Sequence, residues 1–143
     1  MKKIIFVCHG SICRSPAAEF IAKSLSSDYE FASRAVSYEE IGNDIYPPMK
    51  RELTRLGIKF DRHYASRITK EDYDSADYIF YMDSSNKYYL SRMFDDSNNK
   101  ILPIFYFTPE ISEIEDPWYT GNYSKVCDQI TKCIREILKS IKK

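Results

Sequence analysis

Cys8 and Arg14 are separated by five residues, and both follow the apolar run at residues 4–7. A loop of this length that leads into a helix can turn its backbone N–H groups inward and form a concave nest for an anion. The planar guanidinium of Arg14 is suited to bind two oxygens of a phosphate, with the Cys8 sulfur beneath it. The spacing therefore predicts a phosphate-binding loop that carries a cysteine nucleophile.

Cysteine reacts as the thiolate, and helix N-termini and nearby cations favour that form. We therefore expect the Cys8 thiol to be ionised at neutral pH. Gly10 is expected to adopt a backbone conformation that a side chain would resist, and Ser15, followed by Pro16, to cap the next helix. The alternative for Cys8 is a buried, inert cysteine, but this alternative does not explain the glycine, the arginine and the helix start together.

The segment Val7-Cys-His-Gly-Ser-Ile-Cys-Arg-Ser-Pro16 resembles the signature loop of the low-molecular-weight protein tyrosine phosphatases. Asp116-Pro-Trp-Tyr119, far downstream, is the second specific match. Further matches follow the order of that family at residues 33–37, Gly42, 56–58, His63, 67–72 and 82–86. The resemblance implies a phosphomonoesterase that needs no metal or other cofactor and hydrolyses phosphotyrosine and aryl phosphates through a phosphocysteine.

The resemblance also implies the role of each site residue. Cys8 would attack phosphorus, Arg14 would bind the phosphate, and Asp116 would act as general acid and then general base. Ser15 would bond the Cys8 sulfur and ease its departure as a thiolate. The residues implied to bind phosphate are His9, Gly10, Ser11, Ile12, Cys13, Arg14 and Ser15, and those implied to form the substrate pocket are Ile12, Glu39, Trp118 and Tyr119.

These assignments have plainer alternatives. Locally, Asp116 is explained by a helix-preceding or turn position before Pro117, and Trp118 and Tyr119 by simple core packing. The expected ligands are phosphotyrosine proteins or peptides and, in the same site, inorganic phosphate, vanadate or sulfonate anions.

Two positions depart from the family pattern. Ser11 replaces the usual asparagine, which in the family holds the loop in a strained conformation through a network that includes residues matching Ser15, Ser33 and His63. Serine offers fewer hydrogen-bonding groups, so we expect a less rigid loop, with Ser33 and His63 as structural support. Glu39 replaces a large aromatic residue, which predicts an acidic pocket wall and a preference for basic residues near the phosphotyrosine.

The four cysteines are expected to be reduced. The position of Cys13 within the loop, like the resemblance, implies that oxidation forms a reversible Cys8–Cys13 disulfide that protects the nucleophile. Its alternative role is that of a small buried apolar residue. Cys127 and Cys133 belong to the apolar stripe of the last helix and are read as core.

The chain alternates strand and helix patterns. Strands are predicted at residues 4–7, 77–82 and 100–104, the last at a sheet edge because of Pro103. Helices are predicted from Ser15 to Leu25, at 48–56 with Gly57 ending the helix, from a capped start at Thr69, at 84–93 and, most clearly, at 123–141, with a loop at 108–121.

This order of strands and helices predicts an α/β fold: a doubly wound parallel sheet of about four strands, flanked by helices, in a single domain over residues 1–143. Ligands bind beyond the carboxyl ends of strands in such folds.

The composition narrows the class of protein. The 143 residues carry 21 Lys and Arg against 21 Asp and Glu, so the formal charge is zero and gives no electrostatic footprint for nucleic acid or an anionic membrane. The apolar run near the start is too short for a signal peptide or a membrane span. We expect a cytoplasmic monomer, without a metal site because no ligand cluster has metal spacing.

Three alternatives remain open at this level. An arsenate reductase shares such a loop but relays electrons through further cysteines, and residues 78–99 contain none. A protein-arginine phosphatase tends to have threonine where this chain has Ile12, an apolar residue better suited to an aromatic ring. A phosphotyrosine-binding module that has lost turnover is a third alternative, raised by Ser11 and Glu39.

Overall fold

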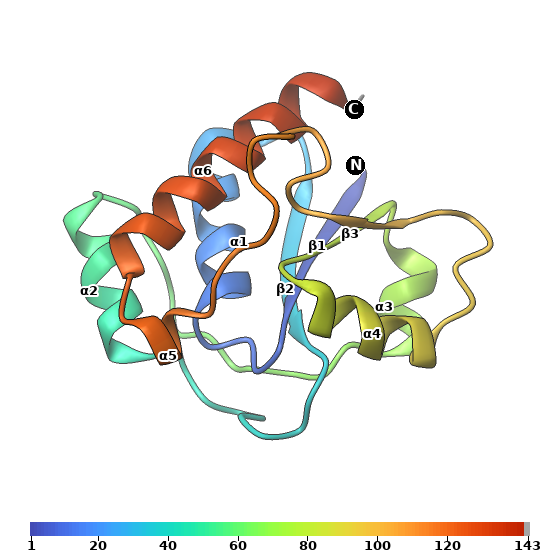
Figure 1. The fold of residues 1–143 in the computed structure, drawn as a ribbon, viewed down its shortest axis with the longest axis horizontal. Coiled ribbons are helices and arrows are strands. Elements are labelled where there is room, and N and C mark those ends of the chain that lie inside the picture. Colours follow the sequence, from blue (N-terminus) through green and yellow to red (C-terminus); the bar gives the residue numbers. More distant parts are fainter. Residues whose placement is uncertain (142–143) are drawn as a thin grey trace.

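Four parallel strands form the centre of the fold in the spatial order β2-β1-β3-β4 (Figure 1). The computed structural model describes residues 1–141, so Lys142 and Lys143 of the expected domain lie outside the described residues. The strands are β1 (Lys3–Cys8), β2 (Glu30–Ala35), β3 (Tyr78–Tyr81) and β4 (Ile101–Pro103). The prediction of a parallel sheet with Pro103 on an edge strand is confirmed.

Strand β1 lies in the middle of the sheet and is buried on both faces, as its β-branched and aromatic residues predict. Successive side chains of a strand point to opposite faces, so β1 contributes to two cores. Ile4 and Phe6 pack in one core, and Ile5 and Val7 pack in the other.

Two layers of helices cover the sheet, as Figure 1 shows. Helices α1 (Arg14–Leu25), α2 (Pro47–Arg55) and α6 (Tyr123–Ser140) pack on the face of Ile4 and Phe6. Helices α3 (Lys70–Ser75) and α4 (Ser84–Met93) cover the opposite face, and the four-residue helix α5 (Pro117–Thr120) lies near the start of α6. The result is the expected single-domain α/β fold, with helices on both faces of a parallel sheet.

Helix α6 buries one apolar stripe, which confirms the strongest pattern in the sequence. Its buried residues include Cys127 and Cys133, which are core residues as predicted. Each large aliphatic side chain in such a stripe contributes roughly 1.5–3 kcal/mol to folding. The buried set is Val126, Cys127, Ile130, Cys133, Ile134 and Ile137.

Local signals place several helix ends correctly. Thr69 and Asp72 form a capping box at the start of α3, and Gly57, with φ of 73°, follows the end of α2. Three expectations were wrong or incomplete. Strand β2 was not predicted, the predicted loop at 108–121 contains α5, and Ser15 makes no cap hydrogen bond because α1 begins at Arg14.

The order of the strands determines where a ligand site forms. From β1 the chain passes to β2 on one side of β1, and from β2 it crosses to β3 on the other side. The direction in which strands are added to the sheet therefore reverses between β1 and β3. Ligands bind at such switch points, beyond the carboxyl ends of the strands. Cys8 ends β1 there, and Asp83 follows β3. Among residues 1–141, no helix has both the length and the apolar character needed to cross a membrane.

Candidate active site

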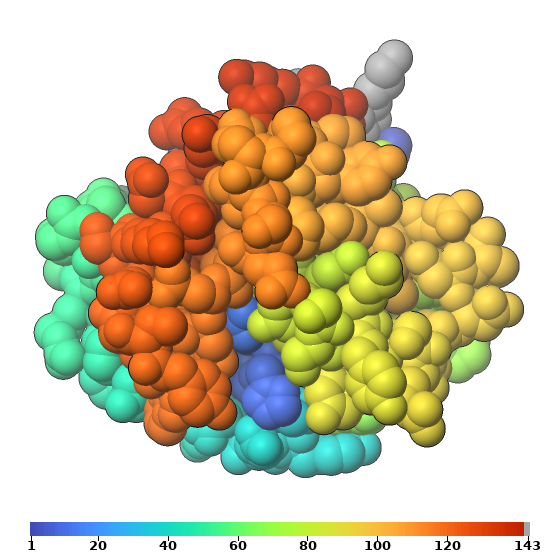
Figure 2. Space-filling view, viewed as in Figure 1, coloured from blue at the N-terminus to red at the C-terminus, as the bar shows by residue number. Residues whose placement is uncertain are grey.

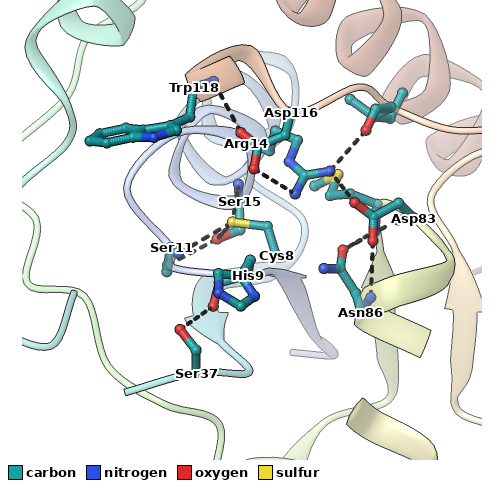
Figure 3. A network of polar contacts seen from close by, with 12 residues as sticks. Cys8, His9, Ser11, Arg14, Ser15, Ser37, Asp83, Asn86, Asp116 and Trp118 are labelled. Atoms are coloured by element: carbon teal, nitrogen blue, oxygen red, sulfur yellow. Dashed lines mark hydrogen bonds and ion pairs between the residues drawn. The ribbon is translucent and has the colours of Figure 1, made fainter. Parts of the chain in front are cut away.

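The Cys8 sulfur lies under the curl of the 8–14 loop and is hydrogen bonded from three directions (Figure 3). The amides of Ser11 and Ser15 donate to Cys8 Sγ at 3.3 and 3.4 Å. In the third hydrogen bond, Cys8 Sγ donates to Ser15 Oγ at 3.2 Å. Donors placed around a sulfur stabilise its anion, so the geometry is suited to a thiolate.

Further amides of the loop are open to an anion. Within residues 1–141, the N–H groups of Gly10, Ile12 and Cys13 donate to no protein acceptor, although all three residues line the same cavity as Cys8. Buried amides normally have a partner. The loop therefore presents donors that a bound oxyanion would satisfy.

Ser11, and not Gly10, adopts the special backbone conformation of the loop. Ser11 has φ of 57°, whereas Gly10 is absent from the residues with positive φ, so the expectation for Gly10 was wrong. An added Cβ at position 10 would lie 3.1 Å from Glu40 Cγ, a tight contact that the Glu40 side chain would have to relieve by moving. A left-handed conformation at a residue other than glycine costs roughly 1–3 kcal/mol and persists only where its surroundings hold it.

Two side chains hold Ser11 in this conformation. The Ser15 hydroxyl donates to Ser11 Oγ at 2.9 Å, and His63 Nε2 lies 2.7 Å from the Ser11 carbonyl oxygen. Burial lowers the pKa of His63, which favours a neutral ring. His63 and Ser15 thus contact the loop as expected. The expectation that Ser33 supports the loop was wrong for its hydroxyl, which donates to Glu19 Oε1.

Arg14 is buried with its guanidinium fixed by acceptors from other elements. Nη1 donates to Asp83 Oδ2 at 2.7 Å and to the Ile114 carbonyl at 2.8 Å, and Nη2 lies 3.6 Å from Asp116 Oδ2 (Figure 3). Burial alone would lower the pKa of Arg14, but the charges of Cys8, Asp83 and Asp116 outweigh that effect and raise it. The guanidinium is therefore a permanently charged and preorganised group at the cavity.

Asp116 stands at the start of α5 with its carboxylate between that helix and Arg14. Its Oδ1 accepts the Trp118 amide at 3.0 Å, which makes Asp116 the N-cap of α5. Asp116 Oδ2 lies 3.6 Å from Arg14 Nη2. The side chain is also 27% exposed and lines the cavity, so the carboxylate is open to a ligand there. The helix-preceding role and the position at the site are both present, and they do not exclude each other.

A cavity of about 160 Å³ brings the predicted residues together. Figure 2 shows this hollow, with the blue surface of the N-terminal segment between the orange region of α5 and the yellow-green α4. A cavity of about 150 Å³ holds a benzene ring, so this one has room for an aryl group. The lining residues are Cys8, His9, Gly10, Ser11, Ile12, Cys13, Arg14, Glu39, Glu40, Asp116, Trp118 and Tyr119.

The cavity has an aromatic wall and a charged wall. Trp118 is half exposed and packs on Tyr46 with ring centroids 4.5 Å apart, while Tyr46 donates its amide to the Ile12 carbonyl. On the other wall, Glu39 Oε2 lies 2.7 Å from His9 Nε2. Trp118 and Tyr119 therefore line the cavity and are largely exposed, and the packing alternative does not describe them.

Comparison with known proteins places this geometry in a family. The family model for low molecular weight phosphotyrosine protein phosphatase matches residues 3–143. The Homo sapiens protein of that name is 37% identical over 96% of this chain and 94% of its own length. The chain belongs to this family.

Two bacterial members of the family support the assignment. The low molecular weight protein-tyrosine-phosphatase YfkJ of Bacillus subtilis is 34% identical over 100% of this chain and 97% of its own length. The crystal structure of SP-PTP from Streptococcus pyogenes, a low molecular weight protein tyrosine phosphatase, matches with a TM-score of 0.89 at 34% identity, over 100% of this chain and 95% of that chain.

Three residues of the site were not predicted from the sequence. Asp83 binds Arg14, Glu40 lines the cavity, and Tyr46 supports Trp118. Asp83 carries a visible signal, because Asp83 and Asn86 have the spacing of a capping box, but that signal predicts only a helix start. No pattern in the neighbouring sequence predicts that the second carboxylate oxygen of Asp83 binds Arg14.

Proposed function

We propose that this chain is a protein tyrosine phosphatase in which Cys8 is the nucleophile, Arg14 binds the phosphate and Asp116 is the general acid and base. One observation carries the proposal: the Cys8 sulfur, the open loop amides and the buried Arg14 guanidinium all line one cavity. A phosphate in the loop would have its oxygens bound by the amides and Arg14, with its phosphorus above the sulfur.

The reaction proceeds in two transfers. In the first, Cys8 Sγ forms a bond to phosphorus, the bond to the phenolic oxygen breaks, and that oxygen takes a proton from Asp116. In the second, water gives a proton to the Asp116 carboxylate and attacks phosphorus, and the Cys8 thiolate leaves. Ser15 Oγ lies 3.2 Å from the sulfur, so its hydroxyl can turn away from Ser11 Oγ and donate to the departing thiolate.

The charge of the transferring phosphoryl group is stabilised by groups already in place. Arg14 is held by Asp83 and by the Ile114 carbonyl, and the 8–14 loop is held at Ser11, so these donors need little rearrangement during the reaction. Preorganised donors of this kind often supply the largest part of a rate enhancement. The proposed route needs no metal ion, and residues 1–141 contain no group of three or more His, Cys, Asp or Glu side chains that could hold one.

The cavity also supports the substrate class. A phosphotyrosine ring would lie between Trp118 and Ile12, where an apolar side chain at position 12 suits an aryl group better than a guanidinium. The same loop would bind phosphate, vanadate or a sulfonate. Because all the proposed groups come from one chain and Cys8 is a free thiol, the proposal extends to a monomer acting in a reducing compartment such as the cytoplasm.

Hydrolysis of p-nitrophenyl phosphate and of a phosphotyrosine peptide, each with and without EDTA, tests the proposal. Turnover should be insensitive to EDTA, blocked by vanadate, absent in Cys8→Ser and low on a phosphoarginine peptide. Asp116→Ala should slow the phosphotyrosine peptide about 10²- to 10⁴-fold and p-nitrophenyl phosphate far less, because p-nitrophenolate leaves without a proton. Equal slowing of both substrates would contradict the acid role of Asp116.

A further inference from the structure

The side chains of His9 and Glu39 are in contact at the mouth of the cavity, with His9 Nε2 2.7 Å from Glu39 Oε2, where the rest of a phosphotyrosine substrate would pass. His9 belongs to the 8–14 loop, and Glu39 belongs to the segment after β2, which His9 also binds through its carbonyl oxygen. The Glu39 side chain is 69% exposed and that of His9 is 35% exposed, so both are accessible to residues that flank the phosphotyrosine.

Other charged or titratable groups line the same cavity as His9 or lie near its ring. From the segment after β2 comes Glu40, from α4 comes Tyr89 with its ring centroid 6.3 Å from that of His9, and from the cavity itself come Cys8, Arg14 and Asp116. Of these, Arg14 is committed to Asp83 and Asp116, and the amides of the 8–14 loop surround Cys8. Glu39 is the group in direct contact with the imidazole of His9.

The net charge of this pair depends on pH. Imidazole is the side chain that most readily gains or loses its charge between pH 5 and 8. When His9 is protonated, its charge cancels that of Glu39. When His9 is neutral, the Glu39 carboxylate is uncompensated and faces the substrate beside Glu40.

We propose that His9 and Glu39 together determine which flanking residues the enzyme accepts: Glu39 favours basic residues, and protonation of His9 cancels that preference. The inference rests on the proposed function and adds a specificity determinant to it. The acidic pocket wall that Glu39 predicts from the sequence is therefore acidic only while His9 is neutral.

The test uses two phosphotyrosine peptides that differ only in having Lys or Glu next to the phosphotyrosine. Neither flanking residue titrates between pH 5.5 and 7.5, and the phosphate group is common to both, so the ratio of their kcat/KM values cancels the basal chemistry. At low salt, the Lys-to-Glu ratio should rise about threefold from pH 5.5 to 7.5, an effect typical of one exposed charge at several ångströms. At 0.5 M salt the rise should largely disappear.

Variants separate the two residues. In His9→Gln the ratio should stay at its high value at both pH values, and in Glu39→Gln it should be lower at both. Glu40→Gln, a neighbouring carboxylate in the same cavity, is the matched control and should keep the rise with pH. A ratio that is flat in the unmodified chain, or that still rises in His9→Gln, would overturn the inference while leaving the phosphatase assignment intact. Lack of turnover of both peptides and of p-nitrophenyl phosphate would instead overturn the proposed function.

Discussion

Arg14 and Asp83 are 69 positions apart in the chain, yet Arg14 Nη1 donates to Asp83 Oδ2 at 2.7 Å. The bond joins the start of α1 to the carboxyl end of β3, across the point where the strand order reverses. Asp83 also caps α4 through its other oxygen, which accepts the Asn86 amide at 2.9 Å. One carboxylate therefore fixes both a helix and the guanidinium that we propose binds phosphate.

We predict that Asp83→Asn lowers kcat/KM on p-nitrophenyl phosphate about 10- to 100-fold, because a guanidinium displaced by about 1 Å loses much of its effect on the transition state. Arg14 would also lose the charge of its partner, so the free energy of unfolding should fall by about 1–3 kcal/mol in urea titrations. Asp95→Asn, an exposed change just beyond α4, is the control and should change neither value. Unchanged kinetics in Asp83→Asn would contradict a positioning role for Asp83.

We predict that Ser11→Asn increases activity. Asparagine tolerates the left-handed backbone better than serine, and its side chain offers more hydrogen-bonding groups. Relief of roughly 1 kcal/mol of strain would correspond to an increase of about fivefold in kcat/KM on p-nitrophenyl phosphate. A decrease in activity with unchanged stability would show that the serine hydroxyl, at 2.9 Å from Ser15 Oγ, is needed as it stands.

We predict an acid sensitivity that comes from His63. Burial lowers its pKa, so the unfolded chain binds a proton more readily than the folded chain does. The contribution of His63 to the free energy of unfolding should therefore be fully present above about pH 6.5, the ordinary pKa of histidine. It should be lost as the pH falls below that value. Urea titrations at pH 7.5 and 5.5 should show this loss, and His63→Gln should reduce it.

The chain has only one other histidine, so His9→Gln is the matched control for the acid sensitivity. It should leave the loss between pH 7.5 and 5.5 in place. An equal loss in unmodified chain and His63→Gln would show that the sensitivity does not arise at His63.

We predict that Cys13 protects Cys8 from irreversible oxidation. Burial and the neighbouring charge of Cys8 raise the pKa of Cys13, so Cys13 should remain a thiol while peroxide oxidises the Cys8 sulfur to a sulfenic acid. The Cys13 thiol then condenses with that sulfenic acid, which forms the disulfide and releases water. After peroxide treatment, a dithiol should restore several-fold more activity to the unmodified chain than to Cys13→Ser, and equal recovery would exclude this role.

The 8–14 loop was predictable from the sequence because its parts are contiguous. A buried strand, five intervening residues, an arginine and a helix start define an anion nest without distant contacts, and the α6 stripe is equally local. Two details of the loop were wrong: the left-handed residue is Ser11 and not Gly10, whose added Cβ would make a tight contact with Glu40, and Ser15 is not the helix cap. The space limit comes from another segment, so the loop sequence does not show it.

Strand β2 was missed because its inward residues are partly polar. Ser33 and Arg34 interrupt the apolar pattern, and their partners, Glu19 and Asp72, come from α1 and α3. The role of Asp83 was missed for a similar reason, since its capping bond explains the residue locally while its bond to Arg14 depends on the packed sheet. Polar groups paired across the fold are thus the features that local patterns do not predict.

Locating the phosphoryl group during turnover shows directly whether Cys8 is the nucleophile. The protein is mixed with ³²P-labelled phosphotyrosine peptide, quenched within milliseconds, digested and mapped by mass spectrometry. We expect phosphate bonded to Cys8 Sγ during turnover, and neither label nor turnover in Cys8→Ser. Label on any other residue, or sustained hydrolysis by Cys8→Ser, would contradict that expectation.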